Sequence, residues 1–260
     1  MTASLREIKV YTTFPHRCSY LEGEEATTLF VDPRQKLSPE LYTQLSLLGF
    51  RRSGDHVYRP HCARCNACIA SRVRVNEFQP SRTQQRVSRR NADLRIEQSD
   101  SILDDEAYNL YRYYIETRHS DGDMYPPERE QYESFLNDGL GCAIYYRLYQ
   151  GNRLVAVTVA DKMLDGLAAI YSFFDPDQPR RSLGTEAILL QIREAQRMSL
   201  PFVYLGYWID GCRKMAYKSR FNPLELFVDG QWQQHKTEQS IAPDTDAVVS
   251  LLDPQRDTTP

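Results

Sequence analysis

Three cysteines at C-x-x-C-x-x-C spacing are the residues whose type and spacing most directly suggest chemistry. They are Cys62, Cys65 and Cys68, and Cys18 precedes them as a possible fourth ligand. Closely spaced thiolates bind Zn²⁺ or iron–sulfur clusters. A zinc finger, however, usually has two separated ligand pairs. The spacing therefore leaves three interpretations open: zinc, a cluster, or reduced thiols that pack a small loop.

The segment around these cysteines is strongly basic. Between Arg51 and Arg95 there are eleven arginines, no lysine and three acidic residues, whereas the whole chain has a formal net charge of −3. A local excess of eight positive charges attracts polyanions. We therefore expect residues 51–95 to contact RNA or DNA. The alternative is a solvated surface with salt bridges, for which few acids lie nearby in the sequence.

Two elements are expected to present these arginines. Alternation in residues 69–78 predicts a strand with Arg72 and Arg74 on its basic face. Ser81 is placed to cap a helix that follows Pro80. The arginines that recur on one face of that helix are Arg82, Arg86, and Arg89 or Arg90.

The rest of the chain predicts an α+β fold. Apolar periodicity and turn residues indicate, in order, helices at 38–49, 104–119 and 126–139, strands at 142–149, 154–163 and 167–174, a helix at 182–198, a strand at 202–207, a short helix at 214–218 and a hairpin around 229–230. From residue 142 onward this order resembles the acyl-CoA N-acyltransferase-like fold. Arg180, Arg181, Ser182 and Gly184 lie at the start of the helix that would face the acyl donor, where N–H groups and arginines can hold a phosphate.

Composition places the protein in a compartment. No apolar run approaches the roughly 20 residues of a membrane span, and residues 1–10 lack the core of a signal peptide. The cysteines are therefore expected to lie in a reducing cytosol, where three closely spaced thiols suit a metal or cluster better than disulfides. We expect a soluble cytoplasmic protein without a membrane partner, and a loosely ordered polar tail at residues 237–260.

Several runs together resemble the arginyl-tRNA–protein transferase family, in its bacterial aspartate/glutamate leucyltransferase branch. The similarity spans about residues 11–235, and so many ordered matches are far more specific than any single one. The matching runs are Cys18-Ser-Tyr-Leu21, Leu29-Phe-Val-Asp-Pro33, Tyr58 through Cys68, Phe78 through Leu94, Arg118-His-Ser-Asp-Gly-Asp-Met124, Tyr171-Ser-Phe-Phe-Asp-Pro176, Ser182-Leu-Gly184, and Tyr204 through Lys218.

The resemblance implies two domains and a reaction. Residues 1–100 would form a family-specific N-terminal domain with the basic, cysteine-containing segment, and residues 101–236 an acyltransferase-like domain. The implied activity is transfer of leucine from leucyl-tRNA to proteins with an N-terminal Asp or Glu, which marks them for degradation. Arginine remains open as the donated residue. Eukaryotic members hold a metal or cluster with paired cysteines in both segments, whereas this chain has only Cys18 in the first.

The implied chemistry needs positioning more than a cofactor. The donor is an activated ester, and an α-amine with a pKa of about 7.7–8.0 is partly neutral at pH 7. Holding amine and ester in line can contribute up to roughly 7–11 kcal/mol, and a base and an oxyanion donor add to this. As base or acid we expect His119 or Asp121, with Tyr207, Tyr217 or Lys218 near the attacked carbonyl.

Binding residues can also be nominated. An acidic acceptor side chain calls for a guanidinium, for which Arg72, Arg74 and Arg118 are candidates. Tyr171, Phe174, Phe173 and Tyr207 could wall a leucyl pocket. Expected tRNA contacts are Arg82, Arg86, Arg89, Arg90, Arg180 and Arg181.

Two other functions fit part of the chain. An acyl-CoA-dependent N-acyltransferase would use the C-terminal half alone and leave the arginine block unexplained. A metal-stabilised nucleic-acid-binding module would use residues 51–95 and give the second half no role. A transferase acting on aminoacyl-tRNA accounts for both halves. The sequence predicts no oligomeric state.

Overall fold

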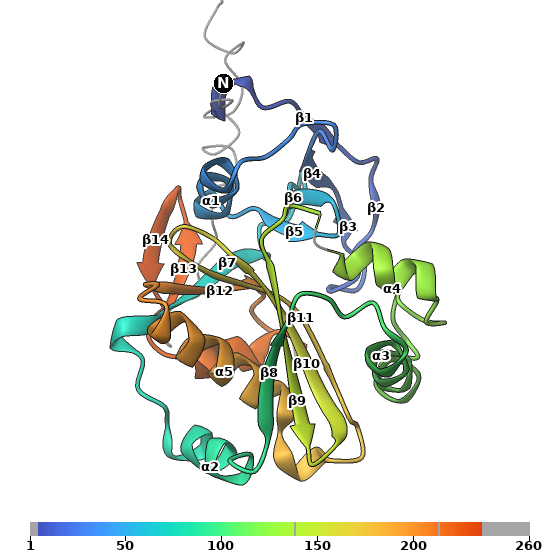
Figure 1. The fold of residues 1–260 in the computed structure, drawn as a ribbon. Helices are drawn as coiled ribbons and strands as arrows, with labels where there is room; N and C mark the ends of the chain where they lie inside the picture. Colours follow the sequence, from blue (N-terminus) through green and yellow to red (C-terminus); the bar gives the residue numbers. More distant parts are fainter. Residues whose placement is uncertain (1–4, 138, 213, 236–260) are drawn as a thin grey trace, which may run out of the picture.

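The computed structural model describes residues 5–137, 139–212 and 214–235 (Figure 1). The described part is a mixed α/β fold around a large sheet. Its α-helices are α1 (Pro39–Leu47), α2 (Arg82–Arg90), α3 (Asp105–Arg118), α4 (Arg129–Leu136) and α5 (Leu183–Arg197), and its 3₁₀ helices are η1 (Leu5–Glu7), η2 (Val75–Glu77), η3 (Pro179–Arg181) and η4 (Ala216–Arg220). None of these helices has the length and hydropathy needed to span a bilayer. The predicted tail at 237–260 lies outside the described residues.

The large sheet draws strands from both ends of the chain. In the described residues its order is β14-β13-β7-β12-β11-β10-β9-β8, and only the β11–β12 pair is parallel. Because β7 lies between β12 and β13, the middle of the basic segment is part of this sheet. The strands are β7 (Ile69–Arg74), β8 (Arg95–Ser99), β9 (Ala143–Gln150), β10 (Arg153–Lys162), β11 (Gly166–Phe174), β12 (Phe202–Trp208), β13 (Leu224–Val228) and β14 (Gln231–Gln234).

A smaller sheet at the N-terminal end was not predicted. Its order in the described residues is β1-β4-β6-β5, and its strands are β1 (Val10–Thr12), β4 (Thr28–Val31), β5 (Arg51–Ser53) and β6 (His56–Pro60). Two further short strands, β2 (His16–Arg17) and β3 (Glu25–Ala26), pair with each other. Strands of two to five residues carry too little alternation to be recognised from sequence. Figure 1 shows this sheet and α1 lying above the large sheet.

Apolar side chains fill both faces of the large sheet. One cluster packs the sheet against α5 and includes Val73, Leu189 and Val203; the other packs it against α1, α3 and α4 and includes Tyr111, Val157 and Phe173. Figure 1 shows α5 on one side of the sheet and α3 and α4 on the other. The sheet is therefore the middle layer of the described structure.

The helix starts predicted at Ser38, Ser81 and Asp104 are confirmed, and for a local reason, whereas the helix predicted at 126–139 begins at Arg129 and the short helix predicted at 214–218 is the 3₁₀ helix η4. The Ser38 hydroxyl accepts from the Leu41 N–H at 3.3 Å, Asp104 caps α3 in the same way, and Ser81 and Gln84 form a reciprocal capping box on α2. The strand predicted at 69–78 is shorter than expected, because it ends at Arg74 and turns into η2. The three strands, helix and strand predicted between residues 142 and 207 are confirmed.

Candidate functional site

The two parallel strands in the middle of the large sheet separate. β11 and β12 pair only at residues 166–168 with 202–204, and a bulge follows between Tyr204 and Gly206. This bulge is in the pairing of β12 with β7, which continues on both sides of it, whereas β11 continues beside β10. Arg51 crosses this divergence: its Nη2 donates to the Ile170 carbonyl at 3.3 Å, and a Cβ at Gly206 would lie 2.7 Å from its Nη1. Diverging strands thus leave main-chain edges that side chains from other elements can reach.

The C-terminus of α3 lies beside the end of β11. His119 caps this helix, and its Nε2 lies 3.0 Å from the Tyr114 hydroxyl. The Tyr114 and Phe174 rings are 4.9 Å apart, and the Arg118 guanidinium lies over Phe174 at 5.4 Å. The structure therefore brings together three of the residues nominated from the sequence: Arg118, His119 and Phe174.

The loop after α3 ties this cluster to two other motifs. The Asp121 carboxylate pairs with the Lys214 ammonium at 3.4 Å. The Ser19 hydroxyl donates to the Asp123 carboxylate at 3.1 Å, although the two residues are far apart in the sequence. Runs near Cys18, Asp121 and Lys214 consequently meet at one place.

Charge states at this loop follow from its contacts. Burial, followed by the nearby Arg118 and Lys214 cations, holds the pKa of His119 below its ordinary value of 6.5. The hydrogen bond from Lys214 lowers the pKa of Asp121 below its ordinary value. At neutral pH His119 is therefore the neutral base of the pair, while Asp121 is an exposed carboxylate that already has a cationic partner.

Lys218 and Tyr207 lie deeper in the structure. Lys218 is 2% exposed; its ammonium donates to the Tyr207 carbonyl and lies 3.3 Å from the Met215 sulfur. Burial, followed by the field of Arg51, lowers the Lys218 pKa to about 7. The Tyr207 hydroxyl lies 3.0 Å from the Gly49 carbonyl oxygen and 3.1 Å from that of Tyr58. Both side chains are engaged by the main chain. Tyr217, in contrast, is exposed.

Arginines from two distant segments meet beside α2. The Arg90 guanidinium donates to the Arg180 carbonyl, and Arg181 donates to the Arg90 carbonyl at 3.1 Å and to the Asp93 carboxylate at 2.8 Å. Arg181 is thus paired, whereas the other predicted tRNA contacts are exposed, namely Arg82, Arg86, Arg89, Arg90 and Arg180.

This basic surface continues to the cluster at the end of β11. The residue before α5, Ser182, has φ 53° and its side chain does not cap the helix. A Cβ at Gly184 would lie 3.0 Å from the Phe174 ring, so the first turn of α5 packs directly against that ring. A path therefore runs from α2 through the N-terminus of α5 to Phe174.

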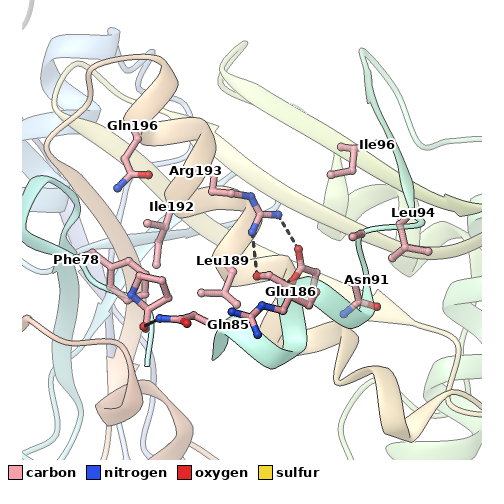
Figure 2. A pocket seen from close by; sticks show the side chains of 14 residues that line it. Phe78, Gln85, Asn91, Leu94, Ile96, Glu186, Leu189, Ile192, Arg193 and Gln196 are labelled. Atoms are coloured by element: carbon pink, nitrogen blue, oxygen red, sulfur yellow. Dashed lines mark hydrogen bonds and ion pairs between the residues drawn. The ribbon is translucent and has the colours of Figure 1, made fainter. Parts of the chain in front are cut away.

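A cavity of about 520 Å³ lies on the same side of the sheet, between α2 and α5. Figure 2 shows its apolar lining by Phe78, Leu189 and Ile192. Arg193 pairs with Glu186 at 2.6 Å along its α5 wall, so the Arg193 charge is neutralised, while the cavity also borders the exposed Arg89. The cavity thus belongs to the surface of α2 rather than to the diverging strands.

The prediction that Arg72 lies on an open basic face of β7 is wrong. Arg72 is buried: its Nε donates to Glu225 at 2.7 Å, and its guanidinium lies between the Phe202 ring at 3.6 Å and the Trp232 ring at 4.3 Å. Arg74 is partly exposed and pairs with Glu77 and Glu225. Few acidic residues lie near these arginines in the sequence, because their shared partner Glu225 comes from β13, which pairs with β7.

The aromatic candidates divide between core and site. Phe173 is fully buried in the core between the sheet and α3. Tyr171 is half-buried, with its ring 5.2 Å from Phe135 of α4. Phe174 is half-buried between α3 and α5. A leucyl pocket walled by Tyr171 and Phe174 therefore stays a prediction.

The four nominated cysteines are close enough to affect one another. Cys18, Cys62 and Cys65 all raise the pKa of Cys68, although burial is the largest cause and brings it to about 12. The Cys18 sulfur accepts the N–H groups of Tyr20 and Leu21 at 3.4 and 3.5 Å. Among the described residues no three His, Cys, Asp or Glu side chains are arranged to hold a metal ion. Metal binding by these cysteines stays a prediction.

Comparison with known proteins identifies relatives across most of the chain. Residues 16–86 match the family model described as arginine-tRNA-protein transferase, N terminus, and residues 106–228 match the corresponding C terminus. The aspartate/glutamate leucyltransferase of Pseudomonas aeruginosa strain LESB58 is 52% identical over 228 residues, which cover 88% of this chain and 97% of that protein. That of Stutzerimonas stutzeri is 53% identical over 229 residues, with the same coverage. Among solved structures, L-PGS from Bacillus licheniformis is 12% identical with a TM-score of 0.46, covering 72% of this chain and 65% of that one.

Proposed function

This chain belongs to the arginine-tRNA–protein transferase family, and we infer that it transfers leucine from leucyl-tRNA to the N-terminal Asp or Glu of proteins. The observation that carries this function is the identity of 52% to an aspartate/glutamate leucyltransferase over nearly its full length. The chain is accordingly an aminoacyltransferase. Residues of several matching runs also meet in space near the end of β11 and the C-terminus of α3, where Ser19 contacts Asp123, Lys214 pairs with Asp121, and Arg118 and Gly184 lie against Phe174.

The reaction forms an amide bond and breaks an ester bond. The neutral α-amine of the acceptor attacks the leucyl carbonyl, and the ribose hydroxyl of the tRNA leaves with a proton. We propose His119 as the base that takes the proton from the attacking nitrogen. It is half-buried, its ring is oriented by Tyr114, and its lowered pKa keeps it neutral at pH 7. Asp121 is the weaker candidate because its carboxylate is exposed and paired with Lys214.

The other nominated residues are assigned by their contacts. Lys218 and Tyr207 would position the end of β12 and the small sheet, because their polar atoms bond to main-chain carbonyls. Tyr217 is exposed next to Lys218 and remains available to the substrate. We propose Phe174, with Tyr171 further along β11, as apolar walls for the leucyl side chain.

The tRNA would approach along α2. The exposed arginines of α2 and Arg180 supply a basic track that ends at the N-terminus of α5. The uncapped first turn of that helix, beside Ser182 and Gly184, suits the 3′-terminal phosphate or ribose oxygens. The acyltransferase-like arrangement expected from the sequence, with a helix N-terminus at the acyl donor, is consistent with this path.

The biological setting is part of the proposal. An N-terminal leucine added to an acidic terminus would create a degradation signal, as in the N-end rule pathway. Both substrates, leucyl-tRNA and newly exposed protein N-termini, occur in the cytoplasm, where we place the protein.

A transfer assay tests the function directly. Purified protein is incubated with radiolabelled leucyl-tRNA or arginyl-tRNA and with peptides that begin with Asp, Glu or Ala. We expect label from leucyl-tRNA on the Asp and Glu peptides only. The same selectivity with arginyl-tRNA would mean that arginine is the donated residue. No transfer from either tRNA by folded protein would overturn the function.

The tRNA path has its own measurement. Replacing Arg86 and Arg89 together with glutamine should weaken leucyl-tRNA binding and reduce the slope of log affinity against log salt by about 2, since each phosphate contact releases counterions. Unchanged salt dependence of binding would show that the tRNA binds to another surface.

A further inference from the structure

Arg51 differs from Arg52 and Arg72, two other arginines that contact the large sheet, in having no ion-pair partner among the described residues. Its Nη2 donates to the Ile170 carbonyl, but among the described residues no carboxylate forms an ion pair with it. Its Nε is shielded from solvent and has no hydrogen-bond acceptor in the described part of the chain. A guanidinium that is partly desolvated and unpaired is costly unless an anion binds to it.

The surroundings of Arg51 suit a small carboxylate. It lies where β11 and β12 diverge, between Ile170 and Gly206. The side chains that interact electrostatically with it are Lys218, whose pKa it lowers, and four tyrosines, namely Tyr58, Tyr207, Tyr20 and Tyr217. The Tyr207 hydroxyl is engaged by main-chain carbonyls, but the other phenol hydroxyls can donate to a second carboxylate oxygen without neutralising the arginine. The side chain is half-buried, so water screens a bound anion less than at an exposed arginine.

We propose that Arg51 binds the side-chain carboxylate of the N-terminal Asp or Glu and thereby determines which N-termini are accepted. This inference rests on the proposed function. The three arginines nominated for this role from the sequence are less suited to it. Arg72 and Arg74 are paired with acids, and Arg118 is exposed over Phe174.

Gly206 keeps the space that the Arg51 guanidinium occupies. It has φ +73°, and a Cβ there would lie 2.7 Å from Nη1 of Arg51. Gly211 has nearly the same backbone conformation, φ +71°, and a Cβ at that residue would meet no atom within 4 Å. G206A and G211A therefore carry similar backbone strain, but only G206A displaces Arg51.

The decisive measurement is kcat/KM for peptides that begin with Asp, Glu, Asn or Gln. In R51Q we expect the rate for Asp and Glu peptides to fall about 100-fold, towards that of the Asn and Gln peptides, because a charged hydrogen-bond partner is lost. R51K should recover part of the discrimination, since it keeps the charge without the planar pair of donors. KM for leucyl-tRNA should stay unchanged. R112Q, which removes an exposed arginine of α3, serves as the control.

The outcomes separate this inference from the proposed function. If the wild type transfers leucine and R51Q lowers kcat/KM for all four peptides equally, Arg51 is structural and the inference fails. If R51Q raises KM for leucyl-tRNA and leaves the Asp-to-Asn ratio intact, the anion is a tRNA phosphate and the inference also fails. A wild type that transfers nothing overturns the function itself.

A second pair of variants covers the case in which R51Q does not fold. G206A should reduce the Asp-to-Asn ratio, while G211A should preserve it at similar thermal stability. Equal ratios in the two glycine variants would contradict the proposed role of Arg51.

Discussion

Two neighbouring arginines of β5 have opposite environments. Arg52 is fully buried, and its Nε and Nη2 each donate to the Asp161 carboxylate at 2.7 Å, while its Nη1 donates to the carbonyls of Gly54 and Asn137. Arg51 points to the other side of the strand, where only the Ile170 carbonyl accepts from it among the described residues. The Arg52 site is closed by protein atoms, whereas Arg51 is half-buried and has no ion-pair partner among the described residues.

The difference separates stability from function within one basic segment. Arg52 joins β5 to Asp161 of β10, and Arg72 joins β7 to Glu225 of β13, so these closed arginines hold distant segments together. A second group, Arg51, His119 and the buried Lys218, has charges and polar groups that the fold leaves incompletely satisfied or shifted in pKa. Variants of the closed sites should change stability, variants of Arg51 and His119 should change activity, and a variant of Lys218 should change how stability depends on pH.

The largest effect is expected from D161N. The change leaves Arg52 buried with a neutral partner, so the free energy of unfolding should fall by about 3–5 kcal/mol. Urea unfolding followed by circular dichroism measures it. Since Tyr42 also donates to Asp161 at 2.8 Å, the matched control is the apolar variant R52M/D161L/Y42F, which should regain most of the stability. A loss below about 1 kcal/mol in D161N would show that the pair is not a closed structural unit.

The next effect is kinetic. H119Q should lower kcat about 100-fold with little change in stability, because a general base contributes factors of this order or more. Wild-type activity should fall as pH falls through the His119 pKa, below 6.5, and this part of the acidic limb should vanish in H119Q. D121N is the comparison. A larger loss of kcat in D121N than in H119Q would identify Asp121, not His119, as the base.

A smaller effect concerns Lys218 and pH. Its pKa is about 7 in the folded protein and 10.5 ordinarily, so between these values the unfolded chain binds more protons. Stability should therefore rise with pH above 7, by at most about 1.4 kcal/mol per pH unit from this group, and fall as pH drops towards 7. K218M should flatten this rise between pH 7 and 9 in urea unfolding. K214M, at an exposed lysine, should leave it unchanged, and an unaltered slope in K218M would exclude a neutral buried amine.

The smallest effect is the stability of R51Q. Its free energy of unfolding should lie within about 1 kcal/mol of the wild type, because the lost hydrogen bond is offset by removal of an unpaired, partly buried charge. The same urea titration measures this. A loss comparable to that of D161N would mean that Arg51 is as structural as Arg52, and the contrast between the two sites would disappear.

Local chemistry in the sequence determined the helices and the C-terminal strands. Ser38, Ser81 and Asp104 cap helices through groups three residues away, and apolar periodicity marks the strands from residue 142 onward. The ordered motifs likewise identified the family. These features depend on neighbours along the chain, so the sequence alone contains them.

Only the tertiary structure decided what each arginine does. β7 pairs with β12 and β13, which places Arg72 beside Glu225, and β5 lies against the large sheet, which places Arg52 beside Asp161 and Arg51 at the diverging strands. The eleven arginines between residues 51 and 95 look alike in the sequence. For Arg52 and Arg72 the neutralising partners lie more than a hundred residues away, and burial changes the strength of each electrostatic contact. Those quantities exist only once the chain has folded.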